Sequence, residues 1–430
     1  MEAHAPVETR PTGEPPPHPS RTSLRGLDWF VFFVANVQTG FGPFINYYLT
    51  SAAWTQVDIG IVLSIGSAVA LAGQMPGGAL VDAVRSERFV AAIAVAVIGA
   101  SALIFALWPF YVAVLGASVL HSAASCVLGP AMAAISLGLV GHAGLSERLG
   151  RNARFAAIGN GIAAAAMGAC GYWLSNRAVF FVTAILMVPA LLALAFIRTS
   201  EIDPERAHGG QPEQPPKRPL SSLLTPARMR PLVVFAAGFT LFQLANSAMF
   251  PLMSSVLTMR SSRWAALLIA AGIVVPQLLV ALISPWIGRR AQIIGRRPLL
   301  LFGFAVLPIR GVLFAVVHDP NVLVIAQLLD GISGAVFGVL VPLVVADVTR
   351  GTGHFNLALG MVGTSIGIGA TVSTTLAGYV SDHLGSNTAF LVLAAIAAAG
   401  LACIWALMPE TRPQDDATPP ADKESARGVA

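Results

Sequence analysis

Long apolar stretches, separated by short polar segments, recur along most of the chain. A helix needs about 20 residues to cross the hydrocarbon core of a bilayer. The stretches are continuous in Ala, Leu, Val, Ile and Gly, without the alternation typical of a membrane β-barrel. The pattern therefore predicts an all-α integral membrane protein with twelve transmembrane helices. The expected spans are residues 27–50, 57–81, 89–108, 111–140, 155–174, 178–197, 232–258, 265–288, 299–317, 321–348, 357–380 and 389–408.

The composition argues strongly against a water-exposed fold. Hydrophobic residues make up 55% of the chain and charged residues only 11%, whereas a soluble domain carries about 25% charged residues. The cysteines Cys126, Cys170 and Cys403 fall inside apolar stretches, where cysteine usually acts as a small hydrophobic residue. We therefore expect neither a disulfide framework nor a metal site.

Basic residues divide unequally between the two sides of the predicted membrane. Of the 26 Lys and Arg residues, 22 fall on the side of the termini, three (Arg177, Arg260 and Arg263) on the other side, and Arg310 within a span. The positive-inside rule then predicts a multi-pass protein of the cytoplasmic (inner) membrane with both termini in the cytoplasm. The net charge of +5 is dispersed over these loops, which indicates contact with anionic lipids of the bilayer and not with nucleic acid.

The chain divides into two similar parts. We expect six-helix bundles over residues 25–198 and 231–410, a Pro- and Gly-rich cytoplasmic linker over 199–230, and disordered cytoplasmic tails over 1–24 and 411–430. A shift of about 209 residues superimposes landmarks of the two bundles, as a duplicated six-helix unit predicts. Gln38 meets Asn246, Pro43 meets Pro251, Gly78 meets Gly288 and Phe181 meets Phe390.

A glycine, acid and arginine motif follows the second span of each bundle. The first copy keeps Gly78, Asp82 and Arg88, and the second keeps Gly288, Gly295, Arg296 and Arg297 but has Gln292 at the acidic position. In these residues the chain resembles the major facilitator superfamily. The resemblance implies two pseudo-symmetric six-helix bundles and transport by alternating access, and it covers residues from about 27 to 410.

The same resemblance implies a role in conformational switching for Gly78, Asp82 and Arg88, and for Gly288, Gly295, Arg296 and Arg297 in the second copy. A small Gly78 lets two helices approach closely. Asp82 can engage loop arginines or the positive end of a neighbouring helix. The alternative is that Asp82 only solvates a helix end.

Ionisable groups within the hydrocarbon indicate functional positions. His121 and Asp330 occupy equivalent places in the repeat, in helices expected to line the central cavity, and both are candidates for proton coupling. Asp28, at the expected start of the first span, is either a helix cap or a third candidate. His121 and Asp330 could instead make structural contacts. Arg310 is deep enough to need a partner, and we expect it to brace the second bundle, with Asp330 as one possible partner.

Amide side chains in the first and seventh spans are the candidates for contact with a solute: Asn36, Gln38, Asn46, Gln243 and Asn246. Few charges and several amides suit an amphiphilic compound. We therefore expect a proton-coupled secondary transporter that exports a small organic solute and works as a monomer without a cofactor. The alternatives are import or facilitated movement of a small metabolite or carboxylate, and a membrane sensor that transports nothing. No catalytic or nucleotide-binding motif occurs, so we do not expect an enzyme or a primary pump.

Overall fold

The computed structural model describes residues 19–413, except 40–44, 46, 47, 51, 85, 211–219, 224 and 261–264. All regular elements in the described residues are helical. The long helices are α1 (Arg21–Thr39), α3 (Gln56–Ala83), α4 (Glu87–Leu107), α5 (Tyr111–Trp173), α6 (Asn176–Ala195), α8 (Pro226–Arg260), α9 (Ala265–Ile294), α10 (Arg296–Val316), α11 (Pro320–Thr349), α12 (Phe355–Leu384) and α13 (Ser386–Leu407).

Local sequence explains where several of these helices begin. The Asp319 carboxylate accepts hydrogen bonds from the backbone N–H groups of Asn321 and Val322, and Pro320 fills the first helical position of α11, where a missing N–H costs nothing. The Ser86 hydroxyl caps α4 by accepting from the Phe89 N–H. Such caps satisfy amides that have no partner inside the helix.

Ten helices in the described part of the chain are long and apolar enough to cross a membrane. One of them, α5, covers the predicted span 111–140 and all but the last residue of the predicted span 155–174. It turns at Gly141, whose φ of 66° and ψ of 179° are not helical. The segment 142–154 was expected to be a loop but is helical, because it buries Leu145 and Leu149 on one face. With α1 and the two parts of α5, the helices match the twelve predicted spans.

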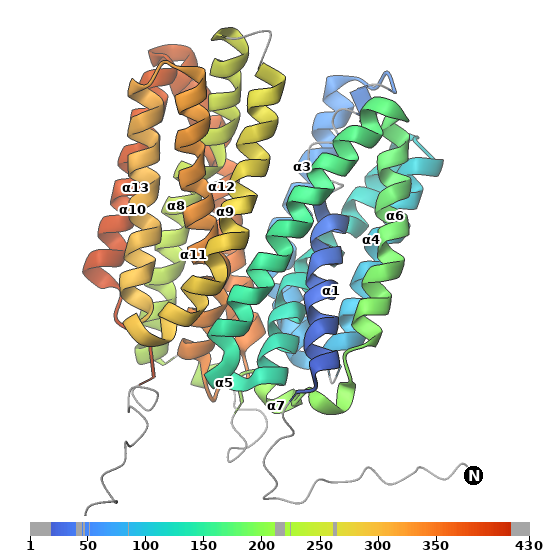
Figure 1. Cartoon of the computed structure of the whole chain (residues 1–430), viewed down its shortest axis with the longest axis vertical. Helices are drawn as coiled ribbons and strands as arrows, with labels where there is room; N and C mark the ends of the chain where they lie inside the picture. Colours follow the sequence, from blue (N-terminus) through green and yellow to red (C-terminus); the bar gives the residue numbers. More distant parts are fainter. Residues whose placement is uncertain are drawn as a thin grey trace, which may run out of the picture.

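The two halves of the chain form separate bundles that meet at one end. The first contains α1 and α3 to α6, and the second α8 to α13 (Figure 1). The core of the second bundle includes Phe239, Phe242, Phe304 and Phe337, whose rings pack edge to face. We call the end at which α1 begins, α13 ends and α7 (Pro204–Ala207) lies the linker end. The ribbons of the two bundles lie close there and diverge toward the other end.

Glycines permit the close contact between the bundles at the linker end. At this end α3 crosses α12 and the second part of α5 crosses α9. A Cβ atom added to Gly78 would overlap the Asn356 carbonyl, and one added to Gly150 would lie 2.6 Å from the Ser284 oxygen. The Ser146 hydroxyl also donates to the Gly288 carbonyl at 2.6 Å. These helices therefore meet backbone to backbone, as small residues allow in membrane proteins.

Candidate functional site

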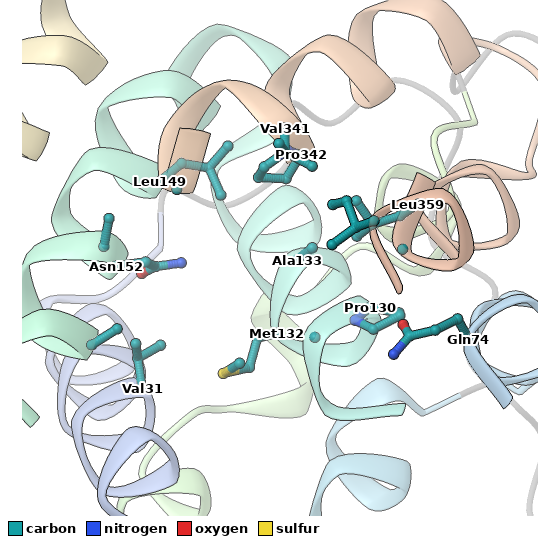
Figure 2. Close-up of a pocket in the computed structure, with 16 residues that line it drawn as sticks. Val31, Gln74, Pro130, Met132, Ala133, Leu149, Asn152, Val341, Pro342 and Leu359 are labelled. Atoms are coloured by element: carbon teal, nitrogen blue, oxygen red, sulfur yellow. The ribbon is translucent and has the colours of Figure 1, made fainter. Parts of the chain in front are cut away.

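A central cavity of about 370 Å³ lies between the two bundles, with walls from α1, α3, α5, α11 and α12. Most of its lining side chains are apolar. Gln74 and Asn152 contribute the polar side chains, and Figure 2 shows them on opposite sides of the cavity, with Met132, Ala133 and Leu149 among the apolar residues. The cavity therefore suits a molecule with a large apolar surface and a small number of hydrogen-bonding groups.

A second cavity of about 330 Å³ adjoins the first inside the second bundle. The two share Gly338, Val341 and Ile366 in their walls. The second is more polar, since Gln243, Asn246, Asp330 and Ser333 line it beside three phenylalanines, Phe239, Phe242 and Phe337. Two of the five amides predicted to contact a solute, Gln243 and Asn246, are therefore at a cavity.

Arg310 connects three helices behind this second cavity. Its side chain is 2% exposed, and its guanidinium donates to the Asp330 carboxylate of α11 and to the Asn246 amide oxygen of α8. The guanidinium also lies 5.8 Å from the centre of the Phe314 ring. The pairing with Asp330 considered from the sequence is thus present. Since Asp330 is 35% exposed while Arg310 is buried, only the acidic partner of this ion pair reaches the cavity.

In the first bundle, Asp28 lies in a buried ionic cluster. Each of its carboxylate oxygens lies 2.5 Å from a guanidinium nitrogen, one of Arg148 and one of Arg151. Arg148 in turn donates to the Asn152 amide oxygen at 2.7 Å, and Asn152 donates to the Ser136 hydroxyl at 2.8 Å. The interpretation of Asp28 as a helix cap is wrong, because α1 begins at Arg21 and Asp28 is two turns inside it.

The remaining sequence candidates in the first bundle do not line either cavity. His121 of α5 is partly buried, with its Nε2 atom 3.5 Å from the Ser125 hydroxyl. Asn36 is buried and donates to the Phe32 carbonyl of its own helix at 2.8 Å. Gln38 is half-buried in α1, and Asn46 lies outside the described residues. The repeat placed His121 and Asp330 at matching positions, but Asp330 lines the second cavity whereas His121 lines neither of these two cavities.

The Asp82 carboxylate joins the two bundles at the linker end. One oxygen accepts from the Asn356 backbone N–H at 3.2 Å and side-chain amide at 2.8 Å, and the other from the Leu357 N–H at 2.7 Å. Because α12 begins at Phe355, these are unsatisfied first-turn amides at the positive end of the helix. Of the two partners expected for Asp82, the helix end is the one present. Arg88 instead donates to the Thr199 hydroxyl at 2.8 Å, within its own half.

The second copy of the motif makes contacts mainly within its own bundle. Gly295, with φ of 99°, turns the chain into α10. Arg296 is buried and pairs with Asp347 at 2.9 Å, and Arg297 donates to the Trp405 carbonyl at 2.6 Å. Two of its residues contact the first bundle: the Gly288 carbonyl accepts from the Ser146 hydroxyl at 2.6 Å, and the Gln292 amide donates to the Ala143 carbonyl at 2.5 Å. The acid-to-amide change in this copy thus still provides one contact between bundles.

Comparison with known sequences assigns the family. A sequence model of the Major Facilitator Superfamily matches residues 29–276 and 245–429. The chain belongs to this superfamily. It is also 38% identical over 400 residues to two uncharacterized MFS-type transporters of Mycobacterium tuberculosis, from strains CDC 1551 and H37Rv, covering 91% of this chain and 94% of each relative. The predicted family and twelve-helix fold class are thereby confirmed.

Solved structures of superfamily transporters share the fold. The human organic anion transporter MFSD10 (TETRAN) superimposes with a TM-score of 0.67 and 16% identity, covering 91% of this chain and all of that one. FucP, the E. coli fucose:proton symporter, was solved in the outward conformation. It superimposes with a TM-score of 0.70 and 15% identity, covering 89% of this chain and 97% of that one. At these identities the likeness concerns the fold.

In this superfamily member the start of the linker is folded onto both bundles. We call residues 199–210 the linker segment. Its Asp203 N–H donates to the Gly138 carbonyl of the first bundle at 3.2 Å. On the other side, the Gly351 N–H donates to the Gly209 carbonyl at 2.6 Å and the Phe355 N–H to the His208 carbonyl at 3.2 Å. The sequence suggested only a spacer here, because its Pro and Gly content gives no sign of these main-chain contacts.

Glu201 anchors the linker segment to Ser20, the residue just before α1. Its carboxylate accepts from the Ser20 N–H at 2.8 Å and lies 3.6 Å from the Arg198 guanidinium. Burial raises the pKa of the Glu201 carboxyl, but hydrogen bonds from Ser20 and Ser23 and the charge of Arg198 outweigh it and hold that pKa below its ordinary value. The ionised form is therefore the one that the folded linker segment favours.

Proposed function

We propose that the protein is a proton-coupled secondary transporter that exports a small amphiphilic organic solute across the cytoplasmic membrane. The central cavity carries this proposal. Both bundles contribute to its walls, its lining is apolar apart from Gln74 and Asn152, and it adjoins the polar cavity of Asp330. A site shared by two bundles is what alternating access requires, and this lining fits a solute with an apolar body and a small number of polar groups.

The linker end is the cytoplasmic end in this proposal, because the basic residues concentrate on the side of the termini. The bundles are then closed toward the cytoplasm by the Asp82 contact to α12 and by the glycine contacts at Gly78 and Gly150. Taking up a solute from the cytoplasm requires these contacts to break. Asp82 and Gly78 therefore act as elements of a cytoplasmic gate.

Among the three candidates for proton coupling, we retain Asp330. It lines the second cavity, whereas Asp28 lines neither of the two cavities, is 2% exposed and is held in ion pairs with Arg148 and Arg151. Protonating Asp330 would leave the buried Arg310 without its counter-ion, which is costly in a low-dielectric interior. Proton binding is therefore coupled to a rearrangement that gives Arg310 another partner. His121 and Asp28 have structural roles in this scheme.

Transport by purified protein in liposomes tests the proposal. A chemically diverse panel of compounds is assayed with and without a pH gradient, using the wild type, Asp330→Asn and the control Asp382→Asn, whose carboxylate is exposed at the end of α12. We expect gradient-driven movement of an amphiphilic compound by the wild type and the control. Asp330→Asn should lose uphill transport but keep exchange or binding.

Two results would contradict parts of this scheme. Uphill transport retained by Asp330→Asn would remove Asp330 from the coupling mechanism. Movement that follows only the solute's own gradient and ignores pH would identify a facilitator and leave the ion pair of Arg310 and Asp330 with a structural role.

A further inference from the structure

A cavity of about 490 Å³ opens on the outside of the second bundle, at the linker end. It lies between the start of α8 and the end of α13, and it shares no lining residue with the central cavity or the second cavity. Ala406, Leu407 and Pro409 give it an apolar wall, and the charged side chains that line it are both arginines, Arg230 and Arg297. The proposed function does not account for this cavity.

The internal repeat provides a related cavity on the first bundle. This one has a volume of about 370 Å³ and lies between the start of α4 and the end of α6. Its lining includes Arg88 beside Phe89, Leu191 and Leu194. Arg88 and Arg297 are 209 residues apart, which is the offset of the repeat. The same arrangement of an arginine next to the last helix of a bundle therefore occurs twice.

Exposed aromatic side chains beside both cavities lead us to expect these cavities at the level where a bilayer meets water. Trp405, two residues before the end of α13, is 65% exposed, and Phe89 near the start of α4 is 63% exposed. Large aromatic side chains exposed at helix ends are typical of the head-group region. An arginine at this depth meets lipid phosphates while its aliphatic part remains in apolar surroundings.

The charges in the second-bundle cavity leave room for an anion. None of the ion pairs in the described part of the chain includes Arg230. Arg297 uses one terminal nitrogen for the Trp405 carbonyl, and its Nε atom is buried without a hydrogen-bond acceptor in the described chain. The nearby Glu410 carboxylate accepts from the N–H groups of Arg296 and Arg297 at 2.8 and 3.0 Å, so it is directed at the start of α10.

We infer that this cavity binds the phosphate of an anionic glycerophospholipid between Arg230 and Arg297, with an acyl chain along the exposed faces of α8 and α13. Guanidinium groups bind phosphate oxygens through paired hydrogen bonds. The cavity at Arg88 is a weaker site of the same kind, because it has one lining arginine, and that arginine already donates to Thr199. The ligand is a membrane lipid and not free phosphate, since the lining combines the arginines with an apolar wall open to the bilayer.

Lipid binding to the full-length protein tests this inference. Purified protein in a neutral detergent is titrated with phosphatidylglycerol, with phosphatidylcholine or with inorganic phosphate, and bound lipid is counted by native mass spectrometry. The variants are Arg230→Gln, Arg297→Gln and both together. The control is the double change Arg289→Gln and Arg290→Gln, which removes the same charge from exposed residues at the end of α9.

We expect selective binding of phosphatidylglycerol that weakens about fivefold for each cavity arginine removed, from the usual effect of a basic residue near an anionic surface. The control double variant should bind as the wild type does. Equal weakening in the control, unchanged binding in the cavity double variant, or competition by inorganic phosphate at the same affinity would overturn the lipid site. If the double variant does not fold, Arg230→Gln alone decides, because Arg230 makes no ion pair with any residue that the structure describes, so its loss breaks none of those contacts.

Discussion

The Asp82 carboxylate of the first bundle caps the helix of the second bundle that contains Leu357 in its first turn. The contact is therefore a helix cap made across an interface that opens in the transport cycle proposed above. A cap within one bundle would only stabilise a helix, whereas this one stabilises the state in which the linker end is closed. Its strength is tied to the ionised carboxylate, since charged hydrogen bonds to backbone N–H groups are stronger than neutral ones.

Replacing Asp82 by Asn should favour opening of the linker end. The amide cannot provide two charged acceptors to the start of α12, and loss of a charge-assisted hydrogen bond costs about 1.5–3 kcal/mol, or roughly 10- to 100-fold in the equilibrium between closed and open states. Distances between spin labels on the ends of α3 and α12 measure this shift. Solute affinity should remain measurable, and a loss confined to binding would refute the gating role. The control is again Asp382→Asn.

Gly78→Ala should also open the linker end, for a steric reason. The new Cβ would overlap the Asn356 carbonyl, so α3 and α12 must separate. The matched control is Gly378→Ala in α12, where an added Cβ meets nothing within 4 Å and where alanine is the better helix former by about 1 kcal/mol. We expect the spin-label distance to rise in Gly78→Ala alone. An unchanged distance there would show that the interface can absorb a methyl group.

Removing Asp330 alone should destabilise the protein more than removing Asp330 and Arg310 together. Asp330→Ala leaves a buried guanidinium without its counter-ion, and we expect the free energy of unfolding to fall by about 3–5 kcal/mol. Adding Arg310→Leu to that variant should restore most of the loss, because an apolar side chain needs no counter-ion. Thermal unfolding in detergent, for the two single variants and the double variant, gives the coupling. Additive losses would mean that the pair does not act as a unit.

The Glu201 carboxyl should make the stability of the linker segment depend on pH. Because its pKa is lower in the folded protein than in the unfolded chain, the stabilisation is complete above the unfolded pKa and is lost as pH falls through the folded pKa. The difference in Tm between the wild type and Glu201→Gln should therefore be largest near pH 7 and shrink in acid. A difference that stays constant with pH would assign the effect to packing alone.

Features with a strong physical requirement could be predicted from the sequence. The spans follow from hydropathy, and a partner for Arg310 followed from the cost of a buried charge. The cavity residues Gln74 and Asn152 were missed, since a single polar residue in an apolar stretch does not indicate which way it faces. Arg148 and Arg151 were missed as partners of Asp28 for another reason. Their segment was assigned to a loop, although the three-residue spacing of these arginines would have placed both on one helical face.

The internal repeat predicted the two six-helix bundles better than it predicted the surroundings of individual residues. The repeat offset relates His121 to Asp330 and Arg88 to Arg297. The match between Arg88 and Arg297 holds in the structure, since each arginine lines a cavity next to the last helix of its bundle. His121 and Asp330 do not share such an environment, because Asp330 lines the second cavity and His121 does not. Which side chains line a cavity also depends on the neighbouring helices, and the repeat offset does not constrain those contacts.

The contacts of the linker segment with the second bundle have a consequence for how this protein can change over evolutionary time. The Gly209 and His208 carbonyls accept from the N–H groups of Gly351 and Phe355, so both contacts use main-chain atoms. Most side chains of the linker segment can therefore be substituted in evolution without loss of these two main-chain hydrogen bonds. Insertions and deletions would be removed by selection there, since a shift of one residue would misplace both carbonyls.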